Sequence, residues 1–301
     1  MKINKRTQES ISPHLSFSPQ KDEVYSRMIL TSPSDQGVMR NLGRNGACYG
    51  PEALINSLKK FNSHFKLKDN EKFLIQNVWQ ELQDSFEANQ NASANLIAQN
   101  IEQHTPQKLV HLGGGHDHIY PLLKGIEQSE AFKNIVILNL DAHCDTRVDT
   151  SSHSGTPFRD YDRQGDLPFH LIQFGIHEYA NSRSTLEKLK RGSEEHYFYN
   201  QSLHQDFVLK DLLTNIPFKI GKETAFVLSL DCDGIQGESM PAVSCVNSNG
   251  IKPEQVFHFI QELNKWETKS FFGVYEFNPV YDTPSHYGRR LISHFVYEYL
   301  K

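Results

Sequence analysis

The sequence predicts an α/β protein with a central, mostly parallel sheet that is covered by helices on both faces. Short, continuously apolar segments recur along the chain, and helix-like segments stand between them. Strands of this kind are buried on both faces, which is typical of a parallel sheet between two layers of helices. Polar and ionisable residues follow several of these segments, as expected where parallel strands end at a ligand site.

Helices are expected to alternate with strands along the chain. Residues 1–25 are expected to form an N-terminal extension or an edge element, and residues 32–54 a glycine-bearing loop. Apolar residues in PEALINSLKKF recur at i, i+1, i+4 and i+7, which predicts an amphipathic helix that begins near Pro51. The expected strands are 72–79, 108–115, 134–141, 170–176, 224–231 and 269–278. Helical segments at 93–103 and 252–266 precede the second and the last of these strands.

Composition restricts the class of protein. The 301 residues include 31 Lys and Arg against 36 Asp and Glu, a net charge of −5, and no dense basic run suits a nucleic acid partner. No window approaches the ~18 apolar residues of a membrane span, and the N-terminus lacks a signal-peptide core, so we expect a soluble, cytoplasmic protein. The four cysteines form no CxxC pair, which argues against a disulfide framework or a zinc ribbon. Without repeats or linkers, residues 1–301 are predicted to form one domain.

Ionisable residues follow four of the predicted strands. They are His116, Asp141, His143, Asp145, Asp231, Asp233 and Glu276. Because the carboxyl ends of parallel strands meet at one edge of a sheet, these side chains are expected to converge. Alternate residues of a straight strand lie ~6.6 Å apart, so one ion cannot bind all of the ionisable residues in DAHCD. Either the chain curls after Asp141 or the site holds two ions.

The chemistry of these residues predicts a dinuclear metal site. Four carboxylates in one partly buried site repel one another, and two divalent cations would offset their charge. Two ions about 3.5–4 Å apart, bridged by carboxylates, are a known hydrolytic arrangement. Carboxylates and imidazoles without an evident thiolate suit manganese and tolerate iron, cobalt or zinc. Each motif alone also fits a turn, a cap or a solvated strand edge, but four of them at successive strand ends favour the metal site.

The order and spacing of four motifs resemble the ureohydrolase family, which includes arginases, agmatinases and formimidoylglutamases. The motifs are Gly-Gly-Gly-His116-Asp, Asp141-Ala-His143-Cys-Asp145, Ser-Leu-Asp231-Cys-Asp233-Gly and Glu276-Phe-Asn-Pro. The resemblance implies an arginase-like α/β/α fold, two Mn²⁺ per subunit, and a homo-oligomer, commonly a trimer or hexamer. It also implies that Asp141 and Asp231 bridge the metals, with His116 and Asp145 completing one site and His143 and Asp233 the other.

Within the family, the sequence is more similar to formimidoylglutamases than to arginases or agmatinases. Three segments carry this similarity: GGGHD, RNLGRNGACYGPEAL, and the SHSGTPFRD that follows DAHCDTR. The resemblance implies hydrolysis of N-formimidoyl-L-glutamate to L-glutamate and formamide, in histidine degradation, by a hydroxide that bridges two Mn²⁺ ions. Glu276 would bind the small-molecule amidine substrate, and Asp145 would carry a proton to the leaving amine. The alternatives are an arginase, agmatinase or guanidinobutyrase, which release urea, and a non-catalytic metal-binding scaffold, against which Glu276 argues.

Further residues are predicted near the mouth of the site. A substrate with two carboxylates calls for arginines, which bind carboxylates in bidentate fashion, and Arg147 and Arg159 lie in the bordering loops. Arginases have a histidine directly before the glycine of the corresponding loop, but here Ser154 holds that position. His153, one residue earlier, could therefore transfer a proton, line the entrance or belong to a surface loop.

Overall fold

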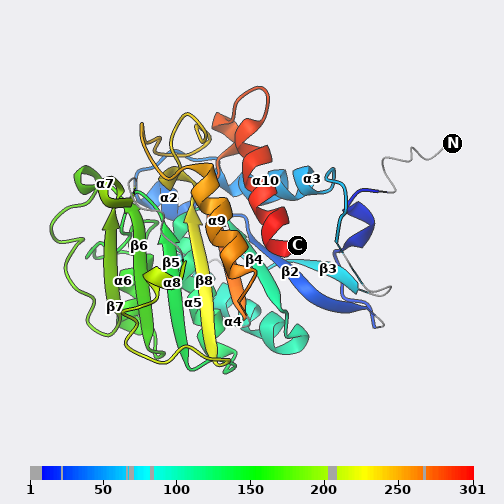
Figure 1. Ribbon diagram of the computed structural model, residues 1–301, viewed down its shortest axis with the longest axis horizontal. Helices are drawn as coiled ribbons and strands as arrows, with labels where there is room; N and C mark the ends of the chain where they lie inside the picture. The colour runs from blue at the N-terminus through cyan, green and yellow to red at the C-terminus, as the bar shows by residue number, and fades with distance from the viewer. Residues whose placement is uncertain are drawn as a thin grey trace.

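A nine-stranded sheet runs through the centre of the molecule, and its strands pair in parallel (Figure 1). The computed structural model describes residues 9–21, 23–65, 67, 71–81, 85–202, 209–266 and 269–301. The strands lie in the order β1-β3-β2-β4-β9-β8-β5-β6-β7. Their bounds are β1 Leu15–Ser16, β2 Val24–Ser32, β3 Glu71–Asn77, β4 Lys108–Gly113, β5 Asn134–Leu140, β6 Phe169–Ile176, β7 Ser193–Phe198, β8 Thr224–Asp231 and β9 Ser270–Tyr275.

Helices cover both faces of this sheet (Figure 1). They are α2 Gln36–Arg40, α3 Gly50–Leu58, α4 Phe86–His104, α5 Ile119–Gln128, α6 Pro157–Gln164, α7 Tyr199–Ser202, α8 Leu209–Leu212, α9 Pro253–Leu263 and α10 Tyr287–Leu300. Short 3-10 turns are η1 Ser12–His14, η2 Ala47–Tyr49, η3 His116–His118, η4 Glu178–Ala180, η5 Cys232–Gly234 and η6 Pro279–Tyr281. Helix α3 has Pro51 in its first turn, as predicted. Helix α4 begins earlier than predicted, because the Ser85 hydroxyl caps it by accepting the Ala88 N–H.

Two apolar layers join the helices to the sheet. The layer under α3, α9 and α10 includes Leu54, Val256 and Phe295, and the layer under α4, α5 and α6 includes Ile97, Leu122 and Phe158. Successive residues of β5 alternate between the layers, with Val136 and Leu138 in the first and Ile135 and Ile137 in the second. Both faces of this strand are therefore buried, which explains the unbroken apolar run at 135–138 and confirms the predicted fold class.

Strand β1 is an edge strand of the sheet and lies within residues 1–25, where an edge element was one of the two expectations, whereas β2 and β7 are absent from the sequence prediction. Polar Ser26 and Arg27 interrupt the apolar pattern of β2, and the Arg27 guanidinium forms an ion pair with Glu71 of β3. Strand β7, SEEHYF, is a half-buried edge strand without an apolar run. Of the predicted N-terminal extension, residues 1–8 lie outside the described part. None of the described helices is long and apolar enough to cross a membrane.

The four motifs follow four neighbouring strands. Strand β4 is followed by the glycines and His116, β9 by Glu276, β8 leads into η5 through Asp231, and β5 is followed by Asp141. These strands lie side by side in the order β4-β9-β8-β5. Because all of them run in the same direction, their carboxyl ends bring the motifs together at one edge of the sheet.

Candidate metal centre

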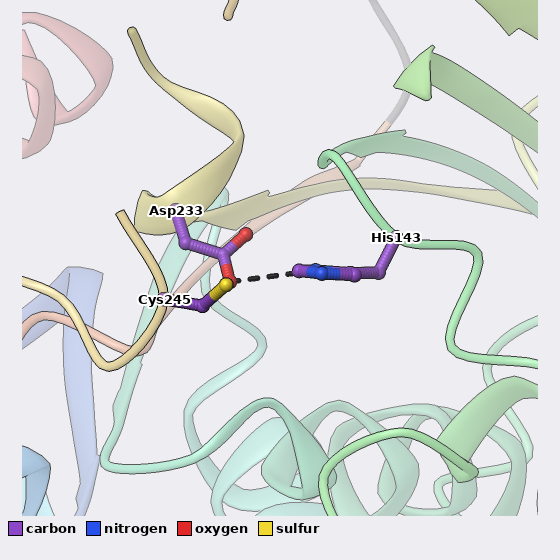
Figure 2. Close-up of side chains that lie close together, drawn as sticks. All are labelled: His143, Asp233 and Cys245. Atoms are coloured by element: carbon purple, nitrogen blue, oxygen red, sulfur yellow. Dashed lines mark ion pairs between the residues drawn. The ribbon is translucent and has the colours of Figure 1, made fainter. Parts of the chain in front are cut away.

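Two clusters of side chains that could hold a metal ion lie at this edge. The first consists of His116, Asp141, Asp145 and Asp231, and the second of His143, Asp233 and Cys245. Within each cluster, one nitrogen, oxygen or sulfur atom from every member lies within 4.8 Å of the others. Figure 2 shows the second cluster, in which His143, from the loop after β5, and Asp233, from the η5 turn, approach each other. The structure thus brings the six residues predicted as ligands into these two clusters.

Asp141 connects the two clusters. Its Oδ2 atom lies 3.2 Å from His116 Nδ1, and its Oδ1 atom lies 3.5 Å from His143 Nδ1. The same Oδ1 accepts the backbone N–H of His143, which begins the turn after β5. Asn139 donates from its amide to Oδ2 and so holds the carboxylate from below. Each oxygen of this one carboxylate therefore faces a different imidazole.

The chain curls after Asp141, as one of the two sequence hypotheses required. Asp145 has a φ of 51°, in the left-handed region that non-glycine residues seldom adopt. Its carbonyl accepts the backbone N–H of Phe158 at the start of α6, which holds this conformation. The curl directs the Asp145 carboxylate back toward the first cluster, where Oδ2 lies 2.8 Å from His116 Nδ1. A straight strand would have carried it away.

The imidazole of His116 is fixed by contacts on several sides. Its Nε2 atom lies 2.8 Å from the hydroxyl of Ser229 on β8, so an Nε2 proton can be donated there. Its Nδ1 atom then faces the carboxylates of Asp141, Asp145 and Asp231, at 3.2, 2.8 and 3.2 Å. Burial opposes protonation of this ring, but the three carboxylates outweigh it and raise the pKa of His116 well above its usual value. In a metal-binding histidine, the ring nitrogen that does not bind the metal is typically held this way.

The buried acids of the site need a positive charge beside them. Burial, together with repulsion among the carboxylates, raises the pKa of Asp231 and Glu276 well above normal and that of Asp233 to about 7. The pKa of Asp141 is instead lowered, because two histidines outweigh the effect of burial. His116 Nδ1 and Asp233 Oδ1 are buried and make no well-directed hydrogen bond to the described residues. This set of donors fits two divalent cations, one at each cluster.

Cys245 was missed by the sequence analysis. It stands in a loop without a motif, yet the structure places its thiol with His143 and Asp233 (Figure 2). A hydrogen bond with His143 lowers the pKa of this thiol. No thiolate was evident from the sequence, whereas the structure places a thiol beside two of the predicted ligands. Cys144 and Cys232 are fully buried, and burial raises the pKa of both, as expected for core residues.

Glu276 lies in a cavity with both clusters. The cavity has a volume of about 210 Å³, and its walls include Asp145, Asp231, His143 and Glu276. The φ of Glu276 is 61°, and its backbone N–H donates to the Gly114 carbonyl at 2.7 Å. Its Oε1 atom accepts the backbone N–H of His116, in the η3 turn, at 3.1 Å. These contacts hold a buried carboxylate at the wall of the cavity.

Arg147 lines the same cavity. Its Nη1 atom donates to the Asn41 side chain at 2.6 Å, and Asn41 in turn donates to the Ser154 hydroxyl at 3.0 Å. Ser154 also lines the cavity. Gly155 lies against the guanidinium, since a Cβ atom there would stand 3.1 Å from Arg147 Nε. Arg147, which was predicted near the mouth of the site, is thus half-buried, and the uncharged Asn41 side chain orients its guanidinium.

Arg159 and His153, which were predicted as site residues, do not lie among the residues that line this cavity. Arg159 is only 5% exposed, and its guanidinium donates to the carbonyls of Thr146, Glu187 and Lys188. His153 has Nε2 at 2.8 Å from the Asp149 carboxylate, and its Nδ1 accepts the Gly155 N–H. Both side chains hold loops together, so the structure does not support a direct contact of either with a substrate.

Comparison with known proteins agrees with this geometry. The model of the Arginase family matches residues 26–301. A formimidoylglutamase of Hahella chejuensis is 30% identical over 284 residues, which cover 90% of this chain and 84% of that protein. A formimidoylglutamase of Salmonella newport is 28% identical over 281 residues, covering 92% and 86%.

Solved structures show the same fold. A Trypanosoma cruzi formiminoglutamase with Mn²⁺ has a TM-score of 0.77 at 22% identity, covering 94% of this chain and 95% of that chain. A formimidoylglutamase from Bacillus subtilis has a TM-score of 0.82 at 17% identity, covering 97% and 91%. The family that the sequence motifs resemble and the predicted arginase-like fold are both confirmed. With its family match and its buried cluster of histidines and carboxylates, the chain belongs to the arginase family and is an amidinohydrolase.

Proposed function

We propose that this chain hydrolyses N-formimidoyl-L-glutamate to L-glutamate and formamide, with two Mn²⁺ ions per subunit. The observation that carries the proposal is one small cavity that contains metal-ligand side chains, the carboxylate of Glu276 and the guanidinium of Arg147. Such a cavity offers an anion to a cationic amidine and a cation to a carboxylate of the same small substrate. The relatives named formimidoylglutamases support this choice of substrate.

The proposed metal ligands are the six predicted from the sequence. Asp141 and Asp231 would bridge, His116 and Asp145 would complete one site, and His143 and Asp233 the other. The position of Asp141 between the two imidazoles supports its role as a bridge, and carboxylate and imidazole ligands suit Mn²⁺. Two divalent cations, when bound, lower the pKa of water and so supply a hydroxide nucleophile near neutral pH.

Two carboxylates would handle the substrate. Glu276 is held by the backbone N–H of His116, and we propose that its carboxylate pairs with the amidinium and aligns the formimidoyl carbon. Asp145 lines the same cavity, and we propose that it carries a proton to the amine of glutamate as the C–N bond breaks. Protonation makes that amine a better leaving group.

Arg147 would bind a carboxylate of the substrate. Arg147→Ala is expected to raise KM for formimidoylglutamate between about tenfold and a hundredfold, because a charge-assisted pair contributes ~1.5–3 kcal/mol. We expect a smaller change in kcat, and Arg147→Lys should not restore binding, because lysine lacks the planar fork. Steady-state kinetics of both variants test this, with Arg163→Ala on α6 as the control, since that side chain is 40% exposed and pairs with Asp160. An unchanged KM in Arg147→Ala would remove this role.

One experiment separates this function from the alternatives. Mn²⁺-loaded protein is incubated with formimidoylglutamate, arginine, agmatine and guanidinobutyrate, and the small product is identified. We expect formamide and L-glutamate from the first compound and no product from the others. Urea from any of the guanidines would instead identify another activity of the family, and no product from all four would favour a non-catalytic scaffold.

We also propose that the enzyme acts in histidine degradation and in the cytoplasm, and that it assembles as a homo-oligomer, a trimer or hexamer. Light scattering of the purified protein measures the last of these directly. A strictly monomeric mass would contradict it and leave the proposed chemistry untouched.

A further inference from the structure

Three polar side chains form a buried chain of hydrogen bonds beside the first cluster. His111 Nε2 lies 2.9 Å from the hydroxyl of Ser32, and His111 Nδ1 lies 3.1 Å from the hydroxyl of Tyr275. All three residues are 0% exposed. They come from the adjacent strands β2, β4 and β9. None of them is among the residues that line the cavity.

Such a chain is unusual between apolar layers, because a buried polar group is costly unless it is hydrogen-bonded. Burial lowers the pKa of His111 well below its usual value, so the ring is neutral and has one donor and one acceptor nitrogen. Both nitrogens have a hydroxyl partner that can donate or accept, so either tautomer satisfies the ring. The bonds compensate the burial of His111, and they fix where the Tyr275 hydroxyl lies.

Two glycines hold the Tyr275 ring close against the backbone. A Cβ atom at Gly113 would stand 2.6 Å from Tyr275 Cδ1, and one at Gly273 would overlap the Tyr275 hydroxyl oxygen. Gly273 pairs with His111 across β9 and β4. The ring can occupy this slot only because both positions lack a side chain, and the bond to His111 sets its position within the slot.

Tyr275 stacks directly on His116. The two ring centroids are 5.1 Å apart, and the rings are inclined by 26°. Phe158 contacts the same imidazole edge to face at 5.6 Å and 89°. Together with the Ser229 contact at Nε2, these rings direct His116 Nδ1 toward the three carboxylates. A shift of the Tyr275 ring would therefore let this nitrogen turn away from them.

We propose that Ser32, His111 and Tyr275 are positioning residues that orient the His116 imidazole and thereby set the metal affinity of the site it completes. This inference rests on the proposed function, in which His116 binds a divalent cation. An imidazole that is already held in place loses less conformational freedom when the cation binds. Mutation of a residue that orients a metal ligand typically lowers metal affinity by ~10–100-fold.

The test is Tyr275→Phe, which removes one hydroxyl and keeps the stacked ring. Tyr299→Phe is the matched control, since Tyr299 is also fully buried and donates from its hydroxyl to the Ser270 carbonyl at the opposite end of β9. The metal-free proteins are titrated with Mn²⁺ alone by calorimetry. We expect Tyr275→Phe to bind one of two Mn²⁺ ions about tenfold more weakly, whereas Tyr299→Phe binds both like the wild type. At saturating Mn²⁺, KM for the substrate should be unchanged.

Ser32→Ala, at the far end of the chain, provides a second variant that leaves ring and slot intact. We expect it to weaken the same Mn²⁺ site by a smaller factor, and the double variant with Tyr275→Phe to behave like Tyr275→Phe alone. Wild-type affinity in both single variants, or an equal loss in Tyr299→Phe, would overturn the inference while the proposed function stands. A wild-type protein that binds no Mn²⁺ would overturn both.

Discussion

Asp141→Asn is expected to lower kcat at least about a thousandfold, equivalent to ~4 kcal/mol of transition-state stabilisation, and to leave at most one Mn²⁺ tightly bound. The reason is the place of this carboxylate between the clusters, with one oxygen facing His116 and the other facing His143. Asparagine keeps the shape but not the charge, and its NH₂ group cannot bind a cation. Metal content after dialysis and steady-state kinetics on formimidoylglutamate measure the two effects.

A second buried carboxylate provides the control for this prediction. Asp162 is 1% exposed and accepts the backbone N–H groups of Lys190, Arg191 and Gly192, away from both clusters. Asp162→Asn should lower thermal stability but leave two Mn²⁺ ions bound. Comparing the two variants separates loss of a ligand from a general loss of stability. If Asp141→Asn kept two ions and normal turnover, the bridging role would be wrong.

The central strands and the convergence of the motifs could be predicted because their signals are local. A strand buried on both faces, such as β5, is apolar wherever its side chains pack against the two helix layers, and the carboxyl ends of parallel strands must share one edge. Strands β2 and β7 could not be recognised in this way, because polar residues interrupt one and an edge position exposes the other. Their pairing depends on neighbours that are distant in the sequence.

The positions of long side chains and loop residues could not be predicted for a similar reason. Arg159 is near the metal motif in sequence, but its guanidinium reaches the carbonyls of Glu187 and Lys188 in another loop. Cys245 carries no motif and is brought to His143 only by the course of the loop after η5. Proximity in the sequence determines where a Cα atom can lie, whereas the direction of a side chain depends on partners that folding supplies.

Glu276→Gln is expected to keep both Mn²⁺ ions and to lower kcat/KM by ~10²–10³-fold. Glutamine has the same shape, and its Oε1 atom can still accept the backbone N–H of His116 that Glu276 accepts at 3.1 Å. The main chain of the η3 turn should therefore stay in place, so metal binding by the first cluster is preserved. The NH₂ group would replace the carboxylate oxygen that we propose accepts hydrogen bonds from the substrate amidinium. Two donors would then face each other. Loss of one partner of a buried ion pair typically costs ~3–5 kcal/mol, and rearrangement of the substrate in the cavity recovers part of this.

Glu194→Gln on the edge strand β7 is the matched control, because Glu194 also accepts a backbone N–H through Oε1 at 3.1 Å, from Leu189, and β7 is separated from β9 by the strands β8, β5 and β6. Its kcat/KM should equal that of the wild type. Three results of the Glu276 variant then have different meanings. Loss of activity with both Mn²⁺ ions retained supports substrate anchoring, and loss of the ions would mean that Glu276 supports the metal site instead. Unchanged kcat/KM with both ions bound would show that the amidinium binds elsewhere, because the variant differs only in an NH₂ group that replaces one carboxylate oxygen at the wall of the cavity.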